Sequence, residues 1–379
     1  MKAWALLSIL LLNCPNASAG GVPSPPPQPA TGPGGAAAPH ARVVARKYDQ
    51  GDAEYWLFEP ASPTPIKASV VIFNHGWSAM SPVVYAAWID HIVCQGNVVI
   101  FPRYQSDLKT KPTNFTRNAM VAVKNALKRL ETEPGHVRPN LDMLAAVGHS
   151  AGGQITAGIA SLAKSYGLPP VKAVMSVQPG KSWGPKRLQI PLDDLRAMPP
   201  NTLLLTVAGD RDTVARDIDA RRIIRESVQV PPQNKNFVTL VSDEHGAPSL
   251  IANHFCPTAP ELKPHQSEAP DSVSGKREAS TNPPNIFAEA LRERIRQRFA
   301  EVTQEVVRKQ KNSGIGSSNQ SRFHAVDALD YFGIWKLFDA LEDAAFYGRN
   351  RQYALGNTPE QRFMGKWSDG IAVKEMIIR

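Results

Sequence analysis

Ser150 lies in a short segment whose residue types suggest nucleophilic chemistry. The segment Gly148 to Gly152 reads G-H-S-A-G and follows the pattern G-x-S-x-G. An apolar stretch, Met143 to Val147, precedes it, and an alanine-containing stretch compatible with a helix follows it. A strand that turns this sharply into a helix leaves no room for side chains at the two glycines, and it exposes the serine at the helix N-terminus. We therefore predict that Ser150 is a nucleophile and that the preceding His149 packs into the fold.

A serine hydroxyl is a weak nucleophile that needs a neighbouring base, and the base needs an acid that orients it. The expected strand Thr202 to Ala208 is followed by two acidic residues, Asp210 and Asp212. We choose Asp212 as the orienting acid, because the additional residues let its carboxylate turn back towards the carboxyl edge of the sheet. Asp210 is expected to hold the turn.

The base is predicted to be His245. It follows the expected strand Phe237 to Val241 and precedes a glycine, so a loop at this point can bring its imidazole over Ser150. Other histidines compete poorly, because one falls in an expected helix and two fall in flexible stretches; they are His254, His265 and His324. The chain order serine, acid, histidine is the order known for triads built on such a turn. The hypothesis of an enzyme depends on the imidazole of His245 reaching the serine hydroxyl.

Two backbone N–H groups are expected to face the oxygen that becomes negative during the reaction. The segment Asn74 to Trp77, N-H-G-W, follows the expected strand Ser69 to Phe73, where a loop contributes one such donor. We assign this oxyanion hole to the N–H groups of Trp77 and Ala151, each worth roughly 3 to 4 kcal/mol in the transition state. The side chains of Trp77 and Trp183 are candidate substrate contacts, and for Trp183 a plain surface or core position is an equal alternative.

The elements around these residues alternate between strands and helices. Apolar stretches predict buried strands at residues 69–73, 97–101, 143–147, 172–177, 202–208 and 237–241, after two earlier strands at 41–48 and 54–58. Helix-compatible stretches separate them at residues 83–94, 115–130, 151–166 and 214–227. This alternation predicts the α/β class, with a doubly wound, mostly parallel sheet covered on both faces. The link 178–199 is too short to form a cap domain.

The N-terminal part of the chain differs in composition from the expected core, residues 41–256. Residues 1–19 combine a lysine, a short apolar run and a small-residue cleavage pattern, so we expect a signal peptide and export to the periplasm or the extracellular space. A lipoprotein modified at Cys14 is a weaker alternative, because Asn13 and Pro15 flank that cysteine badly. Residues 20–40 are rich in Pro, Gly and Ala and predict a flexible linker.

Beyond the core, polar composition predicts a disordered loop over residues 257–285, followed by a C-terminal helical extension, residues 286–379, packed on the core. An amphipathic helix is expected over residues 286–311. Its apolar stripe fits a lid, a membrane contact or packing against the core, and we prefer packing. A helix over residues 326–346 and a closing strand over residues 371–378 complete the extension. No internal stretch approaches the apolar length of a membrane span.

The composition excludes several classes of protein. Of the 379 residues, 42% are hydrophobic and 20% charged, which excludes disordered, collagen-like and coiled-coil chains. The formal net charge of +9 suggests weak association with an anionic envelope surface, but the basic residues are scattered and no nucleic-acid recognition motif accompanies them. We therefore expect no nucleic-acid partner. Whether Cys94 and Cys256 pair is left open, since sequence does not give the distance between them.

Four segments together resemble the α/β-hydrolase superfamily, in particular its serine esterases with a small cap: N-H-G-W, G-H-S-A-G-G, G-D-R-D-T-V and S-D-E-H-G. Such esterases include dienelactone-hydrolase-like, chlorophyllase-like and cutinase-like members. The resemblance covers about residues 55–257 and implies an acyl-enzyme mechanism that uses neither a metal nor an organic cofactor. Two features depart from it: the long segment after the histidine, and the serine itself, since true dienelactone hydrolases use cysteine.

The leading hypothesis is an exported serine hydrolase that cleaves small or polymeric carboxylic esters, with Ser150, Asp212 and His245 as its triad. A non-catalytic envelope binding protein on the same scaffold is one alternative, and the complete triad argues against it. A peptidase or an acyltransferase of the same fold is another, because nucleophiles other than water can capture an acyl-enzyme.

Overall fold

The core of the protein is a sheet of nine strands in the order β1-β2-β4-β3-β5-β6-β7-β8-β9, as far as residues 21–259 and 325–379 show, which are the residues that the computed structural model describes. The strands are β1 (Arg42–Tyr48), β2 (Tyr55–Ala61), β3 (Lys67–Asn74), β4 (Asn97–Pro102), β5 (Arg138–His149), β6 (Ala173–Val177), β7 (Leu203–Gly209), β8 (Lys235–Leu240) and β9 (Ile377–Ile378). The six strands from β3 to β8 pair in parallel with one another, and β1, β2 and β9 are antiparallel additions at the two edges. The predicted α/β class and mostly parallel sheet are confirmed.

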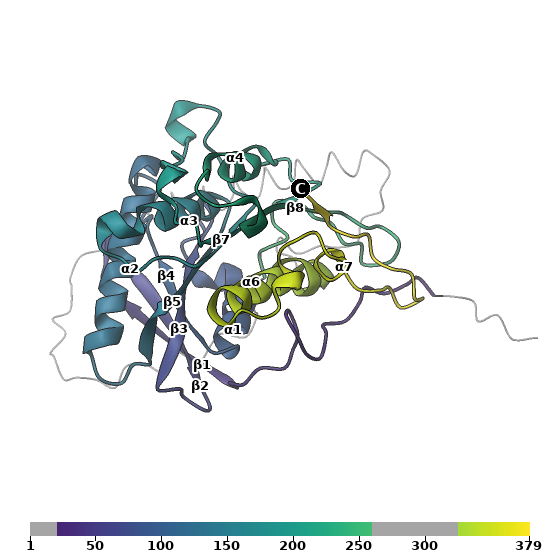
Figure 1. Ribbon diagram of the computed structural model, residues 1–379, viewed down its shortest axis with the longest axis horizontal. Coiled ribbons are helices and arrows are strands. Elements are labelled where there is room, and N and C mark those ends of the chain that lie inside the picture. Colours follow the sequence, from purple (N-terminus) through teal and green to yellow (C-terminus); the bar gives the residue numbers. More distant parts are fainter. Residues whose placement is uncertain (1–20, 260–324) are drawn as a thin grey trace, which may run out of the picture.

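Helices cover both faces of the sheet (Figure 1). Alternate strand residues point to opposite faces, so each face has an apolar cluster that helices bury. In β3, Val71 and Phe73 belong to the apolar cluster that also contains residues of α1 (Ala86–Cys94) and α6 (Lys336–Tyr347). Val70 and Ile72 belong to the cluster on the other face. The helices on that face are α2 (Phe115–Thr132), α3 (Ala151–Leu162) and α4 (Ile218–Glu226). Both faces of the central strands are therefore buried, which explains their nearly continuous apolar sequence.

The C-terminal segment is part of this core. The helix expected over residues 326–346 is present as a π-helical stretch, Leu329–Trp335, that continues into α6 and packs its apolar side on the sheet. A short helix, α7 (Pro359–Arg362), follows. The prediction of a strand over residues 371–378 is wrong for most of that range, because only β9, Ile377–Ile378, pairs with β8. The helix expected over residues 286–311 and the predicted loop from residue 260 onward lie outside the described residues, as does the expected signal peptide.

The segment before β1, which we expected to be a flexible linker, is instead hydrogen-bonded to the body of the protein. The carbonyl of Pro23 accepts from the N–H of Ala247 at 2.9 Å, and the N–H of Gly34 donates to Asp339 in α6 at 2.8 Å. Ser24 and Ser368 exchange two further hydrogen bonds. Composition alone predicts flexibility here, but these tertiary hydrogen bonds fix residues 23–34 against the C-terminal segment.

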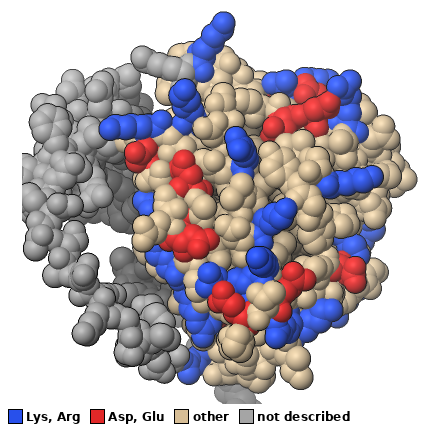
Figure 2. Space-filling model, turned by 90° about the vertical axis from the view of Figure 1, so that its left-hand side faces the viewer, with Lys and Arg blue, Asp and Glu red and all other residues tan. Residues whose placement is uncertain are grey.

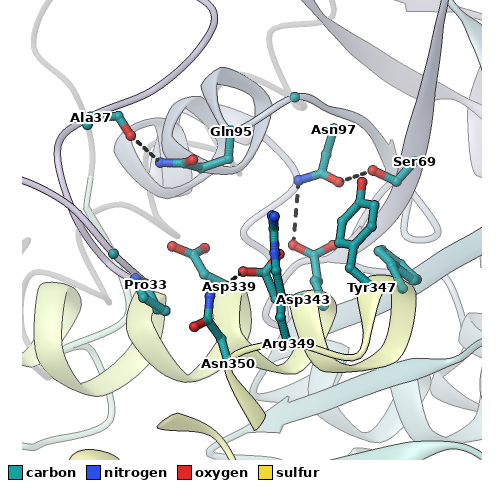
Figure 3. A pocket seen from close by; sticks show the side chains of 14 residues that line it. Pro33, Ala37, Ser69, Gln95, Asn97, Asp339, Asp343, Tyr347, Arg349 and Asn350 are labelled. Atoms are coloured by element: carbon teal, nitrogen blue, oxygen red, sulfur yellow. Dashed lines mark hydrogen bonds and ion pairs between the residues drawn. The ribbon is translucent and has the colours of Figure 1, made fainter.

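A cavity of about 350 Å³ lies where this N-terminal segment meets α6 (Figure 3). It is on the side of the sheet where β3 and β4 begin, since Ser69 and Asn97 line it. Two partly buried carboxylates that line it are already paired. Asp343 binds Arg349 at 2.8 Å, and Asp339 binds the ring of His91 at 2.8 Å.

A third carboxyl group of this cavity, that of Glu342, is buried. Burial, together with the negative charges of Asp339 and Asp343, raises the pKa of Glu342 well above its usual value and so favours its protonated form. The cavity is thus a polar joint between the N-terminal segment and α6, away from the residues that the sequence predicts to be reactive.

The surface agrees with a scattered distribution of charge. On the face in Figure 2, basic side chains are spread among acidic and neutral ones and form no continuous stripe. In the two described ranges, no helix is both long and apolar enough to cross a bilayer. Cys94 and Cys256 are not joined by a disulfide, and Cys256 is buried.

Lys336 provides a test of whether the C-terminal segment is an integral part of the fold. Its buried ammonium group donates to three backbone carbonyls that link α6 to α7, those of Glu360, Gln361 and Phe363. Lys336→Met keeps the length of the side chain but removes these donors, and we expect a loss of about 3 kcal/mol in the free energy of unfolding, measured by urea denaturation. Lys128→Met, at an exposed position of α2, is the control and should change it by less than about 0.5 kcal/mol. Equal effects of the two variants would contradict this account of the C-terminal segment.

Candidate active site

Ser150 occupies a tight turn between β5 and α3. Its backbone has φ 56° and ψ −119°, a strained conformation for a residue with a side chain. A Cβ atom at Gly148 would overlap the carbonyl of Gly152, and one at Gly152 would overlap the carbonyl of Asn74. Both glycines are therefore required by close approach of the backbone. The turn holds the serine hydroxyl at the carboxyl edge of the sheet, as the sequence pattern predicts.

Asp212 lies beyond the end of β7 with its carboxylate buried. One carboxylate oxygen accepts from the N–H groups of Val214 and Ala215, at 2.8 and 2.9 Å, and the other is 2.9 Å from Nδ1 of His254. Burial alone would raise the pKa of Asp212, but the hydrogen bond and charge of His254 and the two N–H groups outweigh it and lower the pKa. Asp212 is therefore a stable anion beneath the imidazole.

Asp210, the other candidate acid, has the role expected of it. Its carboxylate accepts from the N–H of Ser242 at 3.0 Å and from the hydroxyl of the same residue at 2.5 Å. These bonds tie the end of β7 to the end of β8, so Asp210 holds the turn and does not reach the imidazole.

The histidine beside the nucleophile is His254, and the prediction of His245 is wrong. Nε2 of His254 is 3.0 Å from Oγ of Ser150. Because a carboxylate only accepts, Nδ1 of His254 carries the proton that binds Asp212, and Nε2 is left with a lone pair for the serine hydroxyl. The structure thus joins Ser150, His254 and Asp212 in one chain of hydrogen bonds, the arrangement in which imidazole can deprotonate a serine. The hypothesis of an enzyme, which depended on His245, now depends on His254 instead.

His245 lies in a surface excursion of the chain after β8. Asp243 and Leu250 exchange two backbone hydrogen bonds of 2.8 Å, so residues 244–249 form a loop that projects away from the sheet. The ring of His245 is about one-third exposed, and its Nε2 binds the carboxylate of Asp369 at 2.7 Å. The position directly after a strand suggested that this histidine is the base, but the loop carries it outward before the chain returns.

The chain returns to the sheet edge at Ala252, whose carbonyl accepts from the N–H of Arg211 at 3.2 Å. A Cβ atom at Gly209 would overlap this carbonyl, so the glycine at the end of β7 allows the returning chain to approach. Residues 250–256 form turns and extended backbone, not the helix expected there. In the structure the alternate positions Leu250, Ala252, His254 and Cys256 are all buried, as in extended chain. The sequence does not show this period of two, because the intervening Ile251 and Phe255 are also apolar.

The segment expected to supply an oxyanion donor lies beside the nucleophile. A Cβ atom at Gly76 would be 3.5 Å from Cβ of Ser150. The ring of His75 donates to the carbonyl of Gly76 at 2.7 Å and stacks on Tyr104, and burial lowers its pKa to about 4. The structure describes no hydrogen bond from the N–H of Trp77 or of Ala151 to another described residue. Both groups thus stay the predicted donors.

The two tryptophans named as substrate contacts differ in their surroundings. The half-buried ring of Trp77 packs edge-on against Phe115, with the ring centres 5.5 Å apart. Trp183 is also half-buried, and the ammonium group of Lys181 lies 4.6 Å from its ring centre. The segment that carries Trp183 starts near the nucleophile, since the N–H of Gly180 donates to the carbonyl of Ser150 at 3.2 Å. A substrate contact by either ring remains a prediction.

Residues 59–192 match the family model of chlorophyllases. The matched region contains Ser150 and the segment beside it, and it ends before Asp212 and His254. Together with the parallel sheet and the serine turn after β5, this match decides the architecture. The fold is that of an α/β-hydrolase. The matched family points to a hydrolase of ester bonds, and no curated protein sequence matches the chain.

The choice between the two histidines can be tested on the α/β-hydrolase itself through the reactivity of Ser150. A fluorophosphonate probe should label Ser150, and His254→Ala should slow labelling by about 10² to 10⁴-fold because the hydroxyl loses its base. His245→Ala is the matched control and should label at a rate within about twofold of the wild type, since its ring contacts the surface residue Asp369. Intact-protein mass spectrometry follows the labelling. Slow labelling of the His245 variant, with normal labelling of the His254 variant, would reverse the assignment.

Proposed function

We propose that this protein is an exported serine hydrolase that cleaves carboxylic esters through an acyl-enzyme on Ser150. The observation that carries the proposal is the continuous chain of hydrogen bonds from the hydroxyl of Ser150 through His254 to the buried carboxylate of Asp212. The match to the family model of chlorophyllases supports ester bonds as the class of bond that is cleaved.

The first half of the reaction forms the acyl-enzyme. Oγ of Ser150 attacks the ester carbonyl carbon while Nε2 of His254 takes the hydroxyl proton, and the carbonyl electron pair moves to the oxygen. The N–H groups of Trp77 and Ala151 stabilise this oxyanion. When the tetrahedral intermediate collapses, the bond to the alkoxy group breaks, and His254 gives its proton to the leaving alcohol.

Hydrolysis of the acyl-enzyme repeats these steps, with water in place of the serine hydroxyl as the attacking group and Ser150 as the leaving group. His254 takes a proton from a water molecule as it attacks the acyl carbon, and it returns the proton to Oγ of Ser150 as the carboxylic acid leaves. Asp212 holds the imidazole in the required tautomer and stabilises the imidazolium that forms in each half. The anionic state that its hydrogen bonds maintain suits this role.

Export rests on the signal-like pattern of residues 1–19, which supports a periplasmic or extracellular location. For the substrate we propose small or polymeric esters, because the link between β6 and β7 is too short to enclose a long ligand in a cap of its own. The net positive charge supports weak association with an anionic envelope surface.

Two alternatives stay distinct from this proposal. A non-catalytic binding protein on the same scaffold has no need of an aligned serine, histidine and aspartate, and their alignment favours the enzyme. A peptidase or an acyltransferase would use the same acyl-enzyme with a different substrate or acceptor. A screen against esters of graded acyl length, polyesters and peptides separates these activities.

Ser150→Ala tests the proposed reaction directly. The purified protein should hydrolyse p-nitrophenyl acetate, and the variant should lose at least about 10⁴-fold in kcat, because no other hydroxyl is bonded to His254 in the described structure. Ser165→Ala, which removes an exposed hydroxyl just after α3, is the matched control and should retain full activity. Release of p-nitrophenol is followed by absorbance. Equal rates for the wild type and the Ser150 variant would refute the hydrolase.

A further inference from the structure

His149, the residue before the nucleophile, is buried with both ring nitrogens in hydrogen bonds. Nε2 is 2.8 Å from the carbonyl oxygen of His254, and Nδ1 is 2.9 Å from the hydroxyl of Tyr85. The same hydroxyl is 2.9 Å from the N–H of Gly76. The ring of His149 therefore stands between the residue that we propose as the base and the segment that we propose for the oxyanion hole.

The direction of every hydrogen bond in this chain is determined by its ends. The carbonyl of His254 can only accept, so Nε2 of His149 must carry a proton. In the neutral ring, Nδ1 then has a lone pair and accepts from the hydroxyl of Tyr85. That hydroxyl, having used its proton, accepts from the N–H of Gly76. The chain is complete with neutral groups only, and each donor has one acceptor.

The surroundings of His149 keep it in this neutral form. Burial, together with the positive charge that His254 acquires, lowers the pKa of His149 to about 3. Burial also raises the pKa of Tyr85. The centres of the His149 and His254 rings are 4.9 Å apart, so a charged His149 would oppose the imidazolium that the reaction forms.

A second side chain strengthens the hold on the backbone around the base. Gln178, directly after β6, donates through Nε2 to the carbonyl of Asn253 at 2.7 Å. Two successive carbonyls, those of Asn253 and His254, thus accept from side chains at the ends of two neighbouring strands, β6 and β5. Since residues 250–256 form no helix or strand, these bonds provide support that secondary structure does not.

At its other end, the chain of bonds fixes the segment next to Trp77. The N–H of Gly76 is held by Tyr85, and Gly76 lies against Ser150. A displacement of Gly76 would move the N–H of Trp77, the proposed oxyanion donor, away from the substrate oxygen. Misplacement of a catalytic group by about 1 Å can cost about 100-fold in rate.

We propose that His149 is a positioning residue of the hydrolase. It holds the base His254 directly and the oxyanion segment through Tyr85, and it thereby fixes the position of each relative to the other on the two sides of Ser150. This proposal rests on the proposed function. His149 does not touch substrate: it acts through the backbone of His254 on one side and through Tyr85 on the other.

The test compares two acetate esters that differ in how much they need the proton of His254. Loss of p-nitrophenolate needs no proton, whereas loss of ethoxide from ethyl acetate needs protonation by the imidazolium. His149→Leu removes both bonds of the ring. We expect kcat for p-nitrophenyl acetate to fall by about 100-fold with KM within about twofold, and kcat for ethyl acetate to fall at least about tenfold further. His149→Gln, whose amide can both donate and accept, should recover most of both rates.

Tyr85→Phe removes the hydroxyl between His149 and Gly76 but keeps the bond from His149 to the carbonyl of His254, so it acts mainly on the oxyanion side. It should lower kcat for both esters by the same factor, about tenfold or more, because His254 keeps its hydrogen bonds to Asp212 and to His149. Val147→Ala is the control for altered packing. This buried side chain lies two residues before His149 in β5 and has no polar atom, so it takes no part in the chain of hydrogen bonds. It should lower Tm and leave the ratio of the two ester rates unchanged.

Equal losses on the two esters for folded His149→Leu, or no loss, would overturn the proposal, since a side chain that only fills space has no preference for one leaving group. If His149→Leu does not fold, Tyr85→Phe decides, and wild-type rates in that variant would overturn the coupling. An inactive wild type would instead refute the proposed hydrolase, so the two failures are distinguishable.

Discussion

The imidazole of His254 is the group on which the rest of the site depends, because both of its nitrogens are committed. One binds the hydroxyl of Ser150 at 3.0 Å, and the other binds the carboxylate of Asp212 at 2.9 Å. These bonds define the tautomer, and the tautomer decides which nitrogen is available as a base. A ring turned by half a turn, or displaced by one residue along the chain, would meet neither partner.

The parallel sheet makes this convergence possible. Ser150 follows β5 and Asp212 follows β7, while His254 is on the segment that returns to the edge after β8. In the order β5-β6-β7-β8, β7 is the neighbour of β8 and the next neighbour of β5, and all four strands are parallel, so their carboxyl ends meet at one rim. Each approach depends on close backbone contact: Gly148 and Gly152 allow the serine turn, and Gly209 admits the returning carbonyl of Ala252.

Much of this arrangement could be predicted from sequence. The apolar stretches and the G-x-S-x-G segment are local signals, so they predicted the strands, the serine turn and the sheet type. The choice of Asp212 over Asp210 also agrees with the structure, because two residues of chain suffice to turn the carboxylate. The base could not be predicted by the same rule, since nothing local shows that Asp243 and Leu250 close a loop and postpone the return of the chain. The docked N-terminal segment was missed for a related reason: its hydrogen bonds are to residues more than 200 positions away.

The link between Asp212 and His254 is the most direct place to test the account. Asp212→Asn retains shape but offers an amide where the imidazole needs an acceptor, and in the serine–histidine–aspartate triad of a serine protease such a change costs about 10⁴-fold. We expect the single-turnover rate of acylation by p-nitrophenyl acetate to fall by about this factor while Tm stays within a few degrees. Asp210→Asn, whose carboxylate binds only Ser242 in the described structure, should acylate at nearly the wild-type rate. An Asp212→Asn protein that acylates as fast as the wild type would contradict the central role of this hydrogen-bond chain.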